Sequence, residues 1–186
     1  MRSRAFTTFE LVVSIAIASV MFMIVGAIFI AQGRYLAIED AIAETQYYAF
    51  QVVDTVGLYA SPAKSVVSSR TINGSAYVSG TSTVIFELPS IEADGDVIVN
   101  SYDYVAIGVD PSDATQFMFD IDAATNSVRL NGKFVKAELV SKLIFRYNTV
   151  NATAATAVDL YIRTSKNARG RIIRMPLGKI YYLGSS

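Results

Sequence analysis

One carboxylate stands at the end of a long stretch of residues that carries no charge. Glu10 comes directly before residues 11–31, a run of 21 residues in which Ser14 and Ser19 have the only polar side chains. A carboxylate beside so apolar a segment is costly to desolvate unless a positive group neutralises it. The residue type and its position therefore predict that Glu10 has a partner or a specific role, the alternative being a carboxylate that merely faces the interfacial headgroups.

The composition removes most catalytic and metal-binding chemistry. The chain contains no cysteine and no histidine. A disulfide framework, a thiolate metal site and a cysteine nucleophile are thereby excluded, and the commonest general base and zinc ligand are missing. The sequence also has no glycine-rich phosphate loop and no serine-centred nucleophile motif. We therefore expect no enzyme, no catalytic residue and no cofactor.

Two acidic stretches could supply oxygen ligands for calcium. They are Glu92 with Asp94-Gly95-Asp96, and Asp120-Ile121-Asp122 with Asn126. Neither stretch has the ligand spacing of a calcium loop, and turn chemistry explains the same residues. No metal site is predicted.

A basic cluster surrounds the turn residues 167–170. Its members are Arg163, Lys166, Arg169, Arg171 and Arg174. Contact with DNA is one interpretation of this cluster, and a solvated hairpin tip is the other. The hairpin tip is favoured because no aromatic residues are interleaved with the cations. The whole chain carries 16 basic and 16 acidic residues, so it has no overall attraction to nucleic acid.

The apolar run is long enough to cross a membrane. A helix over these 21 residues would be about 31 Å long, roughly the thickness of the hydrocarbon core of a bilayer. Arg2 and Arg4 flank the run on its N-terminal side, which predicts a cytoplasmic N-terminus and export of the rest of the chain. A cleaved secretory signal fits less well, because the run exceeds the usual apolar core of about 7 to 15 residues and no A-x-A-like site follows it. We expect a retained single-pass segment.

A single helix is predicted from about Phe6 to Tyr59. Residues 32–59 contain no proline, and apolar or small residues recur at intervals of three and four: Ile38, Ile42, Thr45, Ala49, Val52, Val56 and Tyr59. This spacing produces an amphipathic stripe, so the second half of the helix should cover another element. The dipeptide Ser61-Pro62 predicts the end of the helix.

The chain after Pro62 is predicted to form short strands separated by turn residues. The expected strands are 66–72, 76–78, 84–88, 97–99, 102–109, 116–121, 127–130, 143–150, 157–163 and 172–183. Asn131-Gly132 is the strongest hairpin signal and places residues 128–130 against residues 134–135. Pro176 predicts a bend or an edge position. The fold class is therefore α+β, with a long N-terminal helix whose amphipathic half packs on an antiparallel sheet.

The N-terminal residues resemble those of the type IV pilin and pseudopilin family. The likeness rests on a short basic leader, then Phe6-Thr7-Thr8-Phe9-Glu10, then a long apolar helix that becomes amphipathic. In that family a prepilin peptidase cuts just before the apolar segment, and the new first residue is commonly an N-methylated Phe. The resemblance implies cleavage between Ala5 and Phe6, methylation of Phe6, and Glu10 at the hallmark fifth mature position. Ala5 stands where the family usually has Gly, and the family's helix-bending proline and cysteine pair are absent.

The resemblance implies a pilin-like division of the chain and a structural role. The expected parts are a leader peptide (1–5), a transmembrane or filament-core half of the helix (6–31), an amphipathic half (32–60) and a β-rich domain (61–186). The implied function is that of a minor pilin or pseudopilin, in which Glu10 pairs with the α-ammonium of Phe6, its own or that of a neighbouring subunit. The implied partners are other pilins, the prepilin peptidase, an inner-membrane assembly platform and membrane lipid.

The expected location is the cytoplasmic (inner) membrane, followed by a cell-surface pilus or a periplasmic pseudopilus. A type IV pilus, a type II secretion system and a DNA-uptake machine all stay open as the assembly that the chain serves. One alternative is a major pilin of the pilus shaft, and another is a single-pass membrane-anchored extracellular binding domain. Nucleic acid is the less favoured partner.

Overall fold

The computed structural model describes residues 7–184, and it begins with one long helix. Helix α1 spans Thr8–Ala60, and the turn that follows contains Pro62, which confirms the predicted helix and its end. The residues up to Asp40 form one compact unit, and those from Ala41 onward form a second. The first unit contains the apolar part of α1, and the second contains the last turns of α1 and all the strands.

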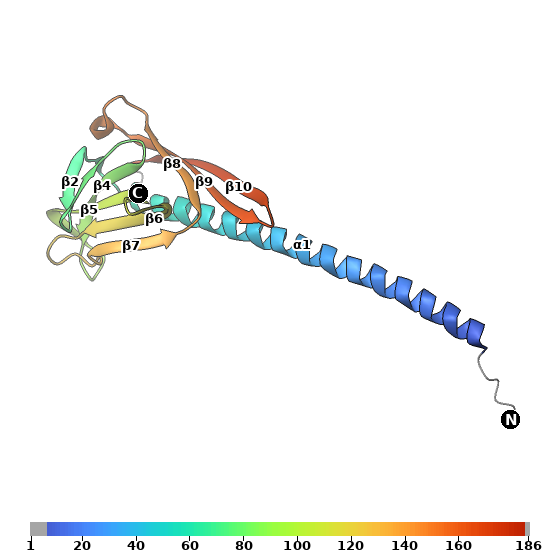
Figure 1. The fold of residues 1–186 in the computed structure, drawn as a ribbon. Coiled ribbons are helices and arrows are strands. Elements are labelled where there is room, and N and C mark those ends of the chain that lie inside the picture. The colour runs from blue at the N-terminus through green and yellow to red at the C-terminus, as the bar shows by residue number, and fades with distance from the viewer. Residues whose placement is uncertain (1–6, 185–186) are drawn as a thin grey trace. The chain divides into compact units, whose positions relative to one another are not determined.

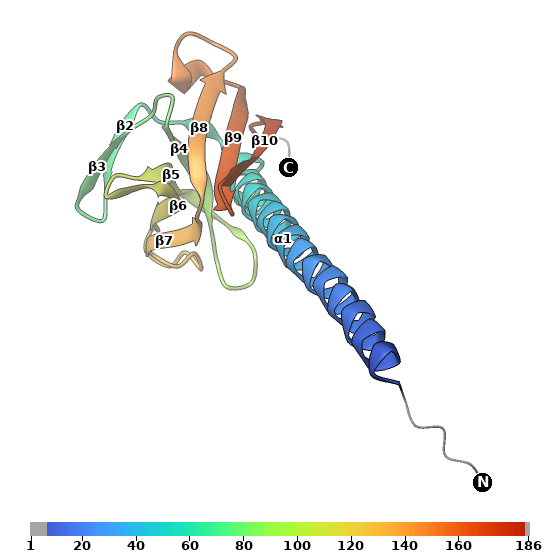
Figure 2. The same ribbon diagram turned by 45° about the vertical axis from the view of Figure 1, so that its right-hand side comes forward.

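The strands of the second unit pair only in the antiparallel sense and form three sheets (Figures 1 and 2). The largest sheet has the order β1 (Ser65–Val66), β4 (Thr83–Ile91), β5 (Val97–Asp110), β6 (Asp113–Asp122) and β7 (Gly132–Ala137). A second sheet has the order β10 (Arg171–Tyr182), β9 (Ala157–Ala168) and β8 (Val140–Tyr147), and β2 (Ser69–Ile72) pairs with β3 (Ser75–Val78). A short 3-10 helix, η1 (Ala152–Ala154), lies between β8 and β9. The predicted α+β fold class is confirmed.

The main core lies between the end of α1 and the two larger sheets. Val52 and Val56 of α1 are fully buried together with Phe86, Phe117 and Phe145 from the strands. The amphipathic half of the helix therefore covers the sheets, as its stripe predicts. Thr45, Ala49, Val52 and Val56 of that stripe are buried, but Ile42 is 37% exposed and its neighbour Ala41 is buried in its place.

The five-stranded sheet is covered on a second face by the β2–β3 hairpin. Ile72 and Tyr77 of the hairpin pack with Ile85, Ala106 and Met118 of the sheet in a separate apolar cluster. The hairpin turns at Asn73-Gly74, and both residues have positive φ angles of 46° and 81°, as the tight turn between two strands requires. A sheet covered on both faces explains why Ile85 and Phe86, which point in opposite directions, are both fully buried.

Three of the strand predictions differ from the structure. Residues 127–130 form no strand, and the predicted hairpin at Asn131-Gly132 is absent; β7 begins at Gly132 and pairs with β6 instead, with Phe119 opposite Phe134. The predicted strand 66–72 is divided between β1 and β2, which belong to different sheets. The predicted strands 97–99 and 102–109 form one strand, β5, with Asn100 at a φ of 59°. Pro176 lies on β10, an edge strand, as predicted.

Candidate functional site

Glu10 lies in the first turn of α1 and forms a reciprocal cap with Thr7. The backbone N–H and the hydroxyl of Thr7 both donate to Oε2 of Glu10, each at 2.9 Å, and the N–H of Glu10 donates to the Thr7 hydroxyl oxygen at 3.3 Å. This pattern of Thr followed three residues later by Glu is a capping box, which satisfies N–H groups that the first turn leaves unpaired. The sequence contained this signal, but the prediction considered only the charge of Glu10.

The capping contacts occupy one oxygen of the carboxylate. Within residues 7–184, the Oε1 atom of Glu10 accepts no hydrogen bond, so it can accept one from outside this turn. The predicted cleavage between Ala5 and Phe6, the methylation of Phe6 and the ammonium partner of Glu10 fall on residues that lie outside the described part of the chain. The structure thus places one of the predicted assembly residues, Glu10, at the start of the helix.

The helix surface that follows Glu10 is apolar on every side and uncovered. Large side chains such as Phe22 and Phe29 are 77% and 69% exposed, and none of the residues in the most apolar stretch is buried. The hydroxyls of Ser14 and Ser19 donate to the carbonyls of Glu10 and Ile15 at 2.7 and 2.8 Å. Both hydroxyl groups thus find their hydrogen-bond acceptors within the same helix, which suits an environment without water.

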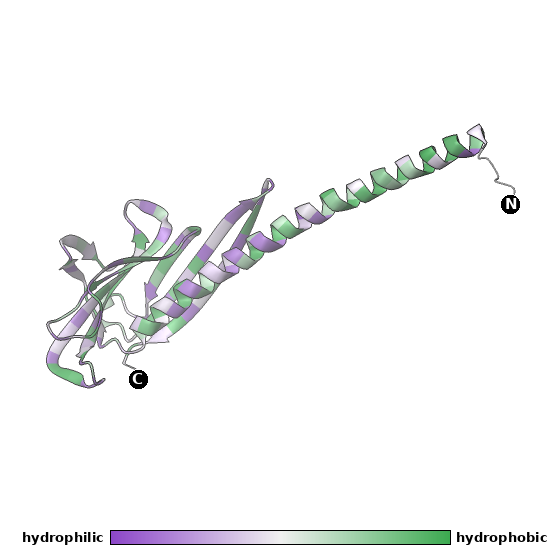
Figure 3. Cartoon of the chain, turned by 90° about the horizontal axis from the view of Figure 1, so that it is seen from below, coloured by the Kyte–Doolittle hydropathy of each residue, from purple (hydrophilic) through white to green (hydrophobic). Residues whose placement is uncertain are grey.

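Among residues 7–184, α1 is the only helix long and apolar enough to cross a membrane. Figure 3 shows hydrophobic residues around the whole N-terminal part of α1, whereas hydrophilic residues appear regularly toward its C-terminal part. The chain is consistent with a single-pass membrane protein.

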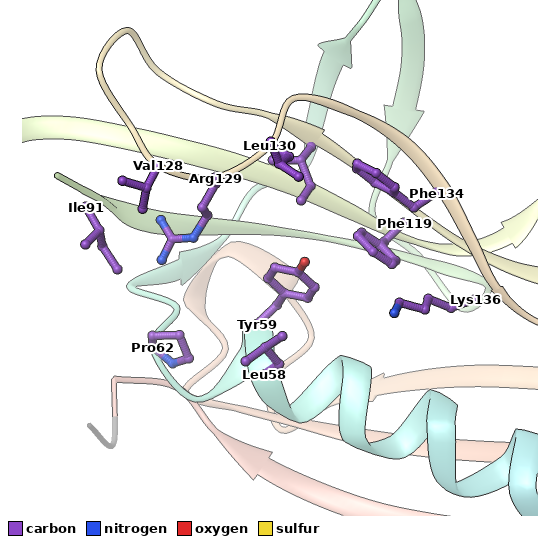
Figure 4. Close-up of a pocket in the computed structure, with 11 residues that line it drawn as sticks. Leu58, Tyr59, Pro62, Ile91, Phe119, Val128, Arg129, Leu130, Phe134 and Lys136 are labelled. Atoms are coloured by element: carbon purple, nitrogen blue, oxygen red, sulfur yellow. The ribbon is translucent and has the colours of Figure 1, made fainter. Parts of the chain in front are cut away.

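The second unit contains an apolar hollow of about 590 Å³ beside the end of α1. Figure 4 shows side chains from α1, β6, β7 and residues 128–130 around it. Tyr59, Phe119 and Phe134 form its aromatic wall, and Tyr59, Arg129 and Lys136 are its only titratable lining residues. Its described lining contains no carboxylate, serine or threonine.

The irregular segment beside this hollow is held by a buried carboxylate, Asp103 of β5. Asp103 accepts hydrogen bonds from the Ser90 hydroxyl and the Ala124 N–H at 2.8 Å each, from the Ser127 hydroxyl at 2.6 Å and from Nη1 of Arg129 at 2.5 Å. Burial opposes ionisation of Asp103, but the hydrogen bonds from Ser127, Ala124, Arg129 and Ser90 outweigh it and lower the pKa of this carboxyl. Sequence analysis missed Asp103, although it shares the inward-facing positions of β5 with Val105 and Ile107, both fully buried.

The two acidic stretches considered for calcium meet donors from the protein. Oδ1 of Asp94 accepts from the N–H of Asp96 at 3.1 Å, which is turn chemistry. Asp120 accepts from the Tyr77 hydroxyl and the Asn73 amide at 2.9 and 2.7 Å, and Asp122 pairs with Arg70 at 3.3 Å. Burial and the hydrogen bond to Asp120 raise the pKa of Tyr77 to about 12. The described residues contain no group of three or more acidic, histidine or cysteine side chains that could hold a metal ion.

The basic cluster is divided by the β9–β10 hairpin. Arg169 and Gly170 form its two-residue turn with φ angles of 50° and 83°, so the predicted hairpin tip is confirmed. Lys166 forms an ion pair with Glu44 of α1, whereas Arg163 lies between the buried Ile162 and Thr164, and Arg174 lies between half-buried residues of β10. The cations that are near one another in sequence therefore do not form one surface.

No protein-family model matches the sequence, and neither a curated protein nor a solved structure is similar enough to be matched. The chain's own residues therefore carry the case for its function.

Proposed function

We propose that the chain is a structural subunit of a type IV pilus or a related filament, held in the inner membrane and assembled through α1. The observation that carries the proposal is one carboxylate, Glu10, at the start of a helix surface that is apolar on every side and uncovered. Such a surface must be covered by lipid or by other apolar helices. The resemblance of residues 4–10 to the pilin processing motif and the α+β fold support the same role.

The charge on Glu10 gives this assembly its register. When apolar helices pack side by side without water, an unpaired carboxylate is costly, and pairing it with an ammonium removes that cost at one axial offset only. Cleavage between Ala5 and Phe6 would create that ammonium close to the carboxylate. The capping contacts keep the Glu10 side chain at the helix N-terminus through Oε2, and Oε1 stays available for the α-ammonium of a neighbouring subunit.

Two explanations of Glu10 can be separated by substitution, because a capping box accepts Gln as well as Glu. Glu10→Gln keeps the shape and the cap but cannot neutralise an ammonium, whereas Thr7→Ala weakens the cap and leaves the charge. We expect Glu10→Gln and Glu10→Ala to insert into the membrane but to be lost from the filament. Glu10→Asp should be intermediate, and Thr7→Ala should be incorporated almost as well as the wild type.

The measurement is the amount of each variant in sheared filaments, divided by its amount in the membrane. Intact mass of the membrane fraction shows in parallel whether residues 1–5 have been removed from each variant. Filament incorporation of Glu10→Gln at the wild-type level would refute charge pairing. Loss of Thr7→Ala together with normal incorporation of Glu10→Gln would show that Glu10 acts only as a cap, and the register would then have to come from other contacts.

A further inference from the structure

The charges of the chain are segregated, although their sum is zero. Residues 140–182, which contain β8, β9 and β10, have eight basic residues and one acidic residue, Asp159. Residues 7–139 have fifteen acidic and six basic residues. A protein with excess positive charge in one part and excess negative charge in another can steer and orient charged partners.

Three of the eight cations come together on the outer face of the three-stranded sheet. Ile162 and Thr164 of β9 are fully buried and face α1, since the Thr164 hydroxyl donates to the carbonyl of Thr45 at 2.8 Å. Arg163, between them, therefore points to the opposite face. Lys142 of β8 is directly opposite Arg163. On the other side of Arg163, Pro176 of β10 is its partner. Arg174 is two residues from Pro176 and therefore lies on the same face.

This outer-face cation trio, Lys142, Arg163 and Arg174, lacks a negative partner. None of the ion pairs formed within residues 7–184 includes any of the three, and the hydrogen bond from Nε of Arg163 goes to the neutral hydroxyl of Ser141, at 3.2 Å. Like charges directly opposite each other in a sheet are destabilising. An external group with several negative charges would relieve this repulsion.

A matching acidic surface is the loop between β4 and β5, here called the acidic loop and made of residues 92–96. Glu92, Asp94 and Asp96 are all exposed, and they form no ion pair within the described residues. The loop is held by backbone hydrogen bonds, from Glu92 N–H to the Asp96 carbonyl and from Gly95 N–H to the Glu92 carbonyl, at 2.8 and 3.1 Å. Figure 2 shows that this light green loop extends beyond the strands of its sheet.

Apolar side chains stand beside both charged surfaces. Val97 and Val99 follow the acidic loop and are 59% and 82% exposed, and Ile172, two residues from Arg174 on the outer face of β10, is 57% exposed. Each charged group of three thus has exposed aliphatic surface next to it. Desolvation of these side chains would add hydrophobic burial to the electrostatic attraction.

We propose that the acidic loop of one copy of this chain docks on the outer-face cation trio of a second copy. Three carboxylates meet three cations, and the valines after the loop pack near Ile172 of β10. The two surfaces are different patches of one chain, so the contact is head-to-tail, and such a contact continues from copy to copy unless its rotation closes a ring. The inference deepens the proposed filament function by naming a second copy as the partner, but the contact itself does not require Glu10.

The absence of cysteine from the chain allows a clean test in membranes that contain the full-length protein. One tagged copy carries Ala93→Cys in the acidic loop and a differently tagged copy carries Ile172→Cys beside the trio, so the charges stay intact. We expect an oxidised heterodimer that links the two tags. The matched control replaces Ala93→Cys with Ala114→Cys, at an exposed alanine near the start of β6, and should give several-fold less heterodimer.

Charge reversal decides whether electrostatics drive the link. Asp94→Lys with Asp96→Lys should reduce the heterodimer several-fold, and Lys142→Glu with Arg174→Glu in the other copy should restore it. Raising the salt concentration from about 0.05 M to about 0.5 M should also reduce it, because the Debye length shortens. A yield equal to that of the Ala114→Cys control, or a yield unaffected by charge reversal, would overturn the proposal.

The same link measured with Glu10→Gln in both copies separates this proposal from the filament function. If the docking is right, the heterodimer should still form with Glu10→Gln in isolated membranes, whether or not filaments are made. If filaments require Glu10 but no heterodimer exceeds the control in any preparation, the docking proposal fails and the filament function stands.

Discussion

Removal of the buried carboxylate of Asp103 should unfold much of what surrounds the apolar hollow. Asp103 is fully buried and accepts from four donors, and the side chain of its ion-pair partner Arg129 is only 14% exposed. In Asp103→Ala, the Arg129 guanidinium keeps the hydrogen bond from Nη1 to the Pro89 carbonyl, at 2.6 Å, but has no counter-charge. Breaking a buried pair by removing one partner costs about 3–5 kcal/mol, so we expect that loss in the free energy of unfolding.

The assay is urea denaturation of a soluble fragment that begins at Arg34, with unfolding monitored by circular dichroism. We expect this fragment to be a folded monomer, because the residues from Ala41 onward form a compact unit with its own core. Asp113→Ala is the control: within residues 7–184, Asp113 receives hydrogen bonds only from Thr115, two residues further along β6, and its loss should cost about 1 kcal/mol or less.

A second change tests the physical cause of the loss. Arg129→Met introduced together with Asp103→Ala removes the orphaned charge, so the double variant should be more stable than Asp103→Ala alone. A loss below about 1 kcal/mol in Asp103→Ala, or a double variant that is less stable than the single one, would refute the claim that this ion pair organises the segment.

Two further predictions concern the strands. Hydrogen bonds from Lys133 and Ser112 lower the pKa of Asp110 from 3.8 to about 2. A lowered pKa contributes its full stability above the unfolded pKa, and this stability should be lost as the pH falls from about 4 to about 2. An acid titration of Asp110→Asn should therefore show a weaker pH dependence in that range. Gly108→Ala should cost about 1–3 kcal/mol in urea denaturation through overpacking, since its Cβ would lie 2.7 Å from the Ser82 carbonyl oxygen, whereas Gly80→Ala, with no atom within 4 Å of its Cβ, should cost far less; equal losses in the two alanine variants would contradict this reasoning.

Local signals predicted the elements of this fold well, and long-range contacts account for the errors. The helix could be predicted because its apolar run, its stripe and Pro62 are all local features. Residues 127–130 alternate like a strand, but their hydroxyl, guanidinium and backbone groups bind Asp103 and its surroundings instead. No local pattern reveals that partner, although a carboxylate at an inward position of β5 is a signal that could have been used.

The same difference between local signals and long-range contacts applies to the candidate site. Glu10 could be recognised because a single charge at the edge of residues 11–31 contrasts with its neighbours. The cation trio could not be predicted, because it depends on the register among β8, β9 and β10, which brings Lys142 opposite Arg163 and leaves Lys166 on the other face with Glu44. Proximity in sequence instead grouped Arg163 and Arg174 with Lys166 and left Lys142 out.

The polar contacts between α1 and its sheet also determine how the second unit responds to a mechanical load. Glu44, Thr45 and Val53 of α1 are joined to Lys166, Thr164 and Tyr181 of β9 and β10, and Thr45 and Val53 are about 12 Å apart along the helix at 1.5 Å per residue. A pull along α1 must therefore break the polar contacts near Thr45 and the contact at Val53 together, along with the apolar packing between these two positions. Resistance to forced unfolding is governed by the rate of unfolding rather than by the equilibrium free energy. The contacts with β9 and β10 and the buried core, rather than the helical propensity of residues 41–60, thus set the force that this part of α1 can withstand.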